Sequence, residues 1–149
     1  MILIHYGSKS FEDNKFREIK NRNFSKPSGG LWTSPIESNW GWKDWCYSED
    51  FRSCEKENSF TIKLKDTAKV FKIDSVSDLL LAPSFDPFPG FKYINYEELS
   101  KEYDAIWLTE LGQIETRFSK PMDLYGWDCE SVLLLNKECF YRVEGLSLF

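Results

Sequence analysis

The sequence predicts an α+β domain, in which short strands and a few helices share one hydrophobic core. About seven short segments have the alternating or continuous apolar pattern typical of strands, and three others begin at residues that cap helices. Strands and helices do not alternate regularly along the chain, as they would in a parallel α/β fold. The 149 residues contain no repeat and no low-complexity linker, so we expect residues 1–149 to form a single domain.

Composition and charge narrow the class of protein. Hydrophobic residues make up 42% of the chain and aromatic residues 17%, which is typical of a globular domain rather than a disordered one. The net charge of −5 argues against a broad surface for nucleic-acid phosphates. The N-terminal apolar run is short and no segment is long enough to span a membrane, so we expect a cytoplasmic protein with no membrane partner.

Cysteine and histidine are too sparse to predict a metal site. The four cysteines form no C-x-x-C pair, and His5 is the only histidine of the chain. A tetrahedral zinc site draws on just these residue types, so we expect no metal. Without an export signal, the cysteines are expected to be reduced and mostly buried.

The first strand is expected at residues 2–6, an apolar run that ends at Gly7 and Ser8 and carries His5 near its C-terminal end. The apolar spacing of residues 11–23 fits either a short helix or an anchored loop. Residues 29–35 start with two glycines and end with a proline, which predicts a turn followed by a very short strand.

Four of the six tryptophans lie within residues 31–45. Ser38 is expected to cap a helix that places Trp42, Trp45 and Cys46 on one face. Such a cluster is either an aromatic part of the core or a wall that stacks against the flat ring of a ligand. The sequence leaves open whether Trp32 faces a cleft or the core.

The middle of the chain predicts further short elements. Ser75 and Asn95 each precede a carboxylate by three residues, a spacing typical of helix N-termini. Three prolines mark residues 83–90 as a loop. Strands are expected at residues 60–64, 70–73, 105–109 and 140–143, with another candidate at 114–118.

Residues 127–136 form a nearly continuous apolar segment, which predicts a buried strand. Two carboxylates, Asp128 and Glu130, stand at its entrance. Because strand side chains alternate, we expect these two to point to one side of the sheet and Cys129 to the other.

Three separated motifs resemble the ADP-ribosyltransferase family, in particular its diphtheria-toxin and poly-ADP-ribose-polymerase branch. They are His5-Tyr-Gly-Ser after the first strand, Gly-Gly-Leu-Trp-Thr-Ser at residues 29–34, and Glu130-Ser-Val-Leu at the late strand. The order matches, although the branch usually has no residue between the histidine and the glycine and has tyrosine where this chain has Trp32. The resemblance implies a split antiparallel β-sheet core with a cleft that holds extended NAD.

The resemblance also implies roles for particular residues. His5 would hydrogen-bond the adenosine ribose, backbone groups just after it would hold the nicotinamide carboxamide, and Trp32 would stack on the nicotinamide ring. Glu130 would be the catalytic residue, and Asp128 would position the acceptor. The implied NAD-binding residues are His5, Tyr6, Gly7, Ser8, Gly30, Leu31, Trp32 and Ser34. A carboxylate suits this chemistry, because the departure of cationic nicotinamide leaves an oxocarbenium-like centre.

The predicted function is therefore transfer of ADP-ribose from NAD to a macromolecule, as in bacterial or phage effectors and toxins. The acidic balance favours a protein acceptor, which the segments 83–90 or 110–116 would present. Two alternatives remain open: a non-catalytic nucleotide- or protein-binding module of the same fold, and an interaction protein that blocks a partner. A cysteine nucleophile built on Cys129 and His5 is disfavoured, because Cys129 is expected to face away from the carboxylates.

Overall fold

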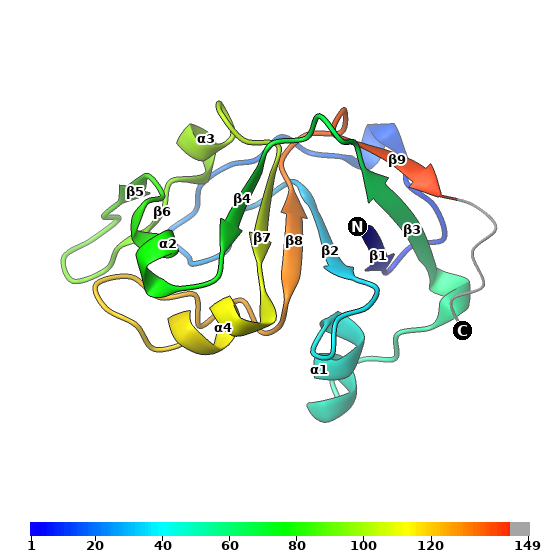
Figure 1. Ribbon diagram of the computed structural model, residues 1–149, viewed down its shortest axis with the longest axis horizontal. Coiled ribbons are helices and arrows are strands. Elements are labelled where there is room, and N and C mark those ends of the chain that lie inside the picture. The colour runs from blue at the N-terminus through cyan, green and yellow to red at the C-terminus, as the bar shows by residue number, and fades with distance from the viewer. Residues whose placement is uncertain (144–149) are drawn as a thin grey trace.

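The computed structural model describes residues 1–143, which form a curved seven-stranded sheet with short helices around it (Figure 1). The strands of this sheet are β1 (Ile2–Tyr6), β2 (Leu31–Pro35), β3 (Ser59–Leu64), β4 (Val70–Ile73), β7 (Ala105–Leu108), β8 (Ser131–Leu134) and β9 (Phe140–Val143). The α-helices are α1 (Trp42–Ser48), α2 (Val76–Leu80), α3 (Tyr96–Leu99) and α4 (Glu110–Thr116), and the 3₁₀ turns are η1 (Asp13–Lys15) and η2 (Lys56–Asn58).

The strand order is β4-β7-β8-β2-β1-β3-β9, and only the β4–β7 pair is parallel. The α+β class is therefore confirmed, and the sheet is mostly antiparallel. The first, second and last of the motif-bearing segments lie next to one another as β1, β2 and β8, although residues 6 and 131 are far apart in the chain.

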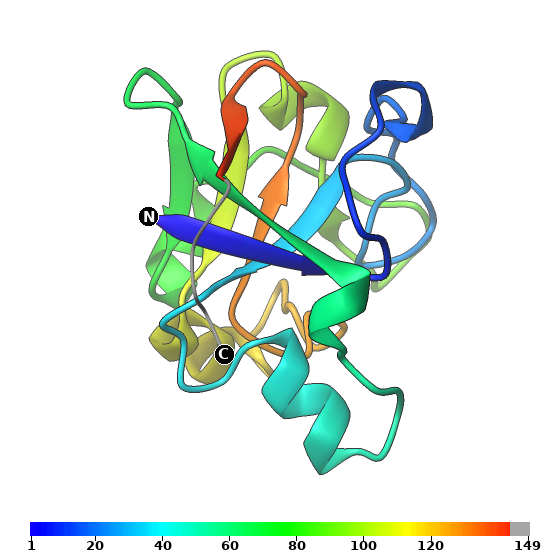
Figure 2. The same cartoon turned by 90° about the vertical axis from the view of Figure 1, so that its right-hand side faces the viewer.

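The sheet opens between β1 and β2. β1 pairs with β3 along its whole length, but with β2 only at Leu3 and Ile4, which face Pro35 and Ser34. Beyond Ile4 the two strands separate, and Figure 2 shows β1 running at a steep angle to β8. This opening leaves room for a cavity within the sheet layer.

Strand alternation builds a core on each face. In β8, Leu133 belongs to a cluster with Trp127 and Tyr96, whereas Val132 and Leu134 belong to the opposite cluster with Leu3. The curvature of the sheet brings β1, β3 and β9 over the second cluster (Figure 1). Both cores are thus built from the same central strands, as expected for period-two side chains.

Two of the three predicted helix caps are confirmed. The side chain of Ser75 accepts the Asp78 N–H at the start of α2, and Asn95 accepts the Glu98 N–H at the start of α3. The third is wrong in position: α1 begins at Trp42, with Gly41 as its N-cap. Ser38 instead accepts the Trp40 N–H within the preceding turn.

The candidate strand at residues 114–118 is wrong, because α4 occupies most of that segment. Thr109 caps this helix by accepting the Gly112 N–H at 3.0 Å. Residues 11–23 form an anchored loop with the single turn η1, fixed by the buried Ile19 and a bridge between Lys20 and Ser28.

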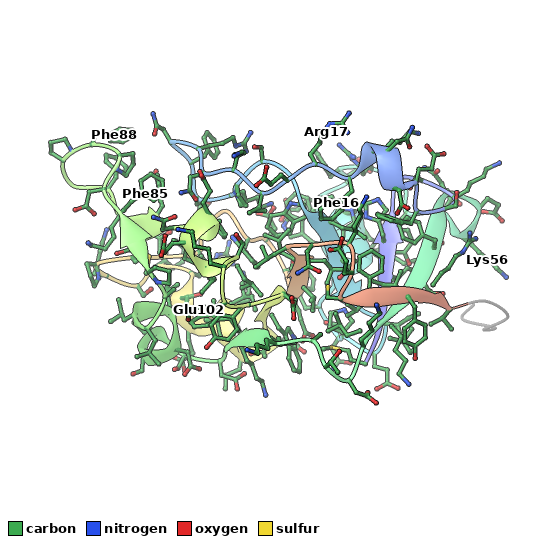
Figure 3. All side chains as sticks on the ribbon, turned by 90° about the horizontal axis from the view of Figure 1, so that it is seen from above. Phe16, Arg17, Lys56, Phe85, Phe88 and Glu102 are labelled. Carbon is green, nitrogen blue, oxygen red and sulfur yellow. The ribbon has the colours of Figure 1, made fainter. Side chains whose placement is uncertain are left out.

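A small hairpin extends from one end of the molecule. β5 (Ser84–Phe85) pairs with β6 (Tyr93–Ile94), so the expected loop at 83–90 contains a two-residue strand. Figure 3 shows Phe85 and Phe88 on this hairpin, with Lys56 at the opposite end of the molecule.

Backbone geometry explains why glycine stands at both residues 29 and 30. Gly29 and Gly30 have φ values of 81° and 72°, a region that favours glycine. A Cβ atom at Gly30 would lie 2.8 Å from the Leu134 carbonyl oxygen, and one at Gly29 would meet the backbone of Glu18. These glycines therefore allow backbone segments of the protein itself to approach one another closely. Within residues 1–143, no helix has the length and apolar character needed to cross a membrane.

Candidate functional site

A cavity of about 310 Å³ lies where β1 and β2 separate, and we call it the β1–β2 cavity. Four aromatic side chains line it, together with two cations and one carboxylate. These are Tyr6, Trp32, Trp42 and Phe51, then Lys26, Arg52 and Asp128. His5, Ser34, Cys129 and Ser131 contribute polar groups. A pocket with aromatic walls and a few convergent polar groups is typical of a small-molecule site.

Trp32 belongs to both the cavity and the core. It lines the cavity, and its ring also packs edge-on against the fully buried Trp127, with ring centroids 4.7 Å apart and an angle of 72°. The core contact fixes the orientation of the indole, so that a ligand would meet a rigid ring.

Trp42 and Trp45 form an aromatic cluster with Phe51 beside the cavity. Trp42 and Trp45 stack with centroids 5.2 Å apart, and Phe51 packs edge-on against both rings. Trp42 and Phe51 line the cavity, whereas Trp45 supports them from behind. One layer of the cluster, Trp42 and Phe51, therefore reaches the cavity, and the cluster lies outside the two hydrophobic cores of the described residues.

His5 is held by a single well-defined hydrogen bond. Its Nδ1 lies 2.8 Å from the Trp32 carbonyl oxygen, and because a carbonyl only accepts, Nδ1 carries the hydrogen. Burial lowers the pKa of His5 from its ordinary value of 6.5, so the ring is neutral at pH 7. In the neutral ring, Nε2 is an acceptor available to a ligand hydroxyl.

Lys26 and Asp128 form an ion pair inside the cavity. The Lys26 Nζ lies 3.4 Å from Asp128 Oδ2 and 5.3 Å from the centroid of the Trp32 ring. Both side chains are about one-third exposed or less, at 30% and 28%. Arg52, the second cation, lies over the Phe51 ring at 4.6 Å.

Ser34 joins three elements. Its hydroxyl donates to the Glu130 carbonyl oxygen at 3.0 Å and accepts the Trp42 N–H at 2.9 Å, which connects β2 to the bend before β8 and to the start of α1. These two bonds explain why a small hydroxyl residue stands here, and they hold Trp42 against the cavity.

Glu130 does not join the β1–β2 cavity. Its side chain is 7% exposed, and its Oε2 accepts the Trp107 Nε1 hydrogen at 2.9 Å. It lines a separate open cavity of about 630 Å³, together with Lys63, Trp107 and Glu110. Glu130 and Asp128 therefore lie in different cavities.

The expectation that Asp128 and Glu130 share one side is wrong, because β8 begins only at Ser131. Residues 128–130 form a bend in which the Glu130 N–H donates to the Trp40 carbonyl oxygen and the Trp40 indole donates to the Asp128 carbonyl oxygen. Strand alternation does not apply to a bend. As a result Cys129 lines the same cavity as Asp128, opposite to the expectation.

Cys129 is nevertheless a poor nucleophile. Burial raises the pKa of the Cys129 thiol to about 11, and the reactive species of cysteine is the thiolate. Its thiol also lies 3.6 Å from the Ser131 hydroxyl. Its chemistry is that of a buried structural thiol.

Four of the predicted binding residues lie outside the cavity lining. The Gly7 N–H donates to the Asn58 carbonyl oxygen, and the Ser8 hydroxyl donates to the Ser10 carbonyl oxygen. The Gly30 N–H donates to the Arg17 carbonyl oxygen, and the Leu31 side chain packs on the core beside Leu3. The structure brings together His5, Tyr6, Trp32, Ser34 and Asp128.

Sequence reasoning missed Lys26, Phe51 and Arg52. All three lie in irregular segments, where no periodicity indicates which way a side chain points. The one available signal is the Phe51-Arg52 pair, a ring beside a cation near a tryptophan cluster. Among residues 1–143, no group of three or more His, Cys, Asp or Glu side chains is arranged to hold a metal ion.

No known protein family model matches the chain, and neither a curated protein nor a solved structure matches it.

Proposed function

We propose that the protein is an NAD-dependent ADP-ribosyltransferase that binds NAD in the β1–β2 cavity. One observation carries the proposal. The three motif-bearing segments are distant in sequence, yet β1, β2 and β8 are neighbours, and residues at or beside them line one cavity. His5, Trp32 and Asp128 are the three that matter most, because they offer an acceptor, a ring face and a carboxylate.

The cavity chemistry suits parts of NAD. The neutral His5 has Nε2 free to accept a ribose hydroxyl, and Trp32 offers a fixed face for an aromatic ring. Lys26 and Arg52 are the cations within reach of a diphosphate. A volume of about 310 Å³ is enough for the nicotinamide ribose portion, with the rest of the dinucleotide extending outward.

The reaction would break the bond between ribose C1′ and the nicotinamide nitrogen. The bonding electrons go to the nitrogen, neutral nicotinamide leaves, and a nucleophile of the acceptor bonds to C1′ while its proton passes to water. A carboxylate near C1′ stabilises the positive charge of the transition state. The family resemblance assigns this role to Glu130, whereas the cavity lining favours Asp128.

The acceptor is proposed to be a protein, and the setting the cytoplasm, where an effector or toxin would meet it. Helix α4 exposes apolar side chains, with Leu111 56% and Ile114 68% exposed. Together with the net charge of −5, this surface suits contact with a protein better than with nucleic acid.

A nicotinamide-release assay with NAD tests the proposal. The wild-type protein is expected to release nicotinamide, and Asp128→Asn to lose most of that activity. Glu130→Gln separates the two assignments: loss of activity supports Glu130, and retention supports Asp128. If the wild-type protein releases no nicotinamide, with or without a protein lysate as acceptor, the proposed enzymatic activity is refuted.

A second candidate is a non-catalytic nucleotide-binding module of the same fold. The position of Glu130, hydrogen-bonded to Trp107 and outside the β1–β2 cavity, favours this candidate. NAD would then raise the melting temperature by mass action without any nicotinamide being released. Thermal unfolding with NAD, run beside the release assay, distinguishes a binder from an enzyme.

A further inference from the structure

The ammonium group of Lys26 lies beside both an indole ring and a carboxylate in the β1–β2 cavity. It lies 5.3 Å from the centroid of Trp32 and 3.4 Å from Asp128 Oδ2. An indole face and a carboxylate both attract positive charge, and here they attract the same one. We propose that Lys26 is a tethered cation that fills this subsite in the free protein and that a ligand with a flat cationic ring displaces it.

The ring of Trp32 and the backbone that carries the Asp128 carboxylate are fixed in place. Trp32 is held edge-on against the buried Trp127, and the backbone of Asp128 is tied to the Trp40 indole by a hydrogen bond of 3.2 Å. A fixed ring face, with a carboxylate carried by a fixed segment of backbone beside it, forms a preorganised subsite. The subsite therefore remains in place when the lysine leaves it.

Lys26 itself can leave. It lies in an irregular segment, its side chain is 30% exposed, and a lysine stem has four rotatable carbons that let the head move into water. Exposed or half-exposed lysine ion pairs are weak, so the cost of displacement is small but not zero. Lys26 therefore competes with any cationic ligand for the Trp32 face.

This competition sets the charge selectivity of the cavity. A pyridinium ring with a positive charge gains both the indole face and the Asp128 carboxylate, whereas the neutral form of the same ring gains neither in full. The inference rests on the proposed function in one respect, because the nicotinamide ring of NAD is cationic before cleavage and neutral after it. Lys26 would then favour release of neutral nicotinamide by returning to its place.

Binding of N1-methylnicotinamide, a cation, and of nicotinamide, its neutral counterpart, tests the proposal by calorimetry. Lys26→Met is expected to bind N1-methylnicotinamide about ten-fold more tightly than the wild type, because the lysine no longer competes. Its affinity for nicotinamide is expected to stay within about two-fold. Lys26→Gln serves as a second variant that keeps a polar side chain.

The chain offers a matched control. Lys72 lies 4.7 Å from the Trp107 ring centroid and 3.4 Å from Asp74 Oδ2, so it has the same two kinds of partner away from the cavity. Lys72→Met is expected to leave both affinities unchanged. Unchanged or weaker binding of the cation by Lys26→Met and Lys26→Gln would overturn the proposal, as would a lack of cation binding by every variant. These binding measurements involve no turnover, so a negative result here is distinguishable from a negative result in the nicotinamide-release assay.

Discussion

Replacing Glu130 separates a structural role of its carboxylate from a chemical one. The side chain is 7% exposed, and its Oε2 accepts the Trp107 indole hydrogen at 2.9 Å. Glu130→Ala removes one buried methylene, worth about 0.8 kcal/mol, together with the carboxylate. It also leaves the indole N–H of Trp107 without an acceptor. This loss costs about 1 kcal/mol, the low end of the usual range, because Trp107 is only half-buried. The expected loss in the free energy of unfolding is about 2 kcal/mol.

Glu130→Gln is the matched control, because the amide keeps both methylenes and an oxygen acceptor for Trp107. It loses only the added strength of a charged acceptor, about 1 kcal/mol or less. Urea unfolding followed by circular dichroism measures both variants, and the expected difference between them of about 1 kcal/mol corresponds to a midpoint difference of about 0.5 M.

A double-mutant cycle with Trp107→Phe tests the same contact. Once the indole donor is gone, Glu130→Ala is expected to cost about 1 kcal/mol less than in the wild-type background. Equal destabilisation by Glu130→Ala and Glu130→Gln, or a cycle with no coupling, would refute the view that this hydrogen bond holds Glu130 in place.

Three further predictions concern the cavity and its supports. Gly30→Ala is expected to lower the free energy of unfolding by about 1–3 kcal/mol, because φ is 72° and the added Cβ would press on the Leu134 carbonyl oxygen; a change below 0.5 kcal/mol by urea unfolding would contradict it. Ser34→Ala is expected to cost about 1–3 kcal/mol, since the Trp42 N–H and the Glu130 carbonyl oxygen each lose a partner, and Ser34→Thr tests whether the hydroxyl alone suffices. His5 has a pKa below 6.5 in the folded protein, so its contribution to stability is complete above pH 6.5 and is lost as the pH falls toward the folded pKa. The stability difference between wild type and His5→Asn should therefore shrink from pH 7.5 to pH 5, and a difference that grows would exclude this linkage.

Local chemistry in the sequence was enough for many elements. Ser75 and Asn95 cap helices because their side chains satisfy an N–H three residues away, an interaction that depends on neighbours in the chain alone. The run Ala105–Leu108 is recognisable as a strand from its continuous apolar pattern, and its side chains fill the cores on both faces of the sheet. The prediction of a strand at residues 114–118 failed. Thr109 caps a helix at residues 110–116, and Gly112 packs against the Ile73 backbone.

The sequence by itself determined the α+β class and most strand positions. Only the tertiary structure decided which side chains face the β1–β2 cavity. The bend at residues 128–130 is held by Trp40, about ninety positions away in the chain, and it places Asp128 in the lining of the β1–β2 cavity and Glu130 against Trp107. Lys26 reaches the Trp32 face from an irregular segment with no periodicity. Short-range patterns fix backbone conformation, but the direction of a side chain outside regular structure depends on partners that the fold brings in from elsewhere.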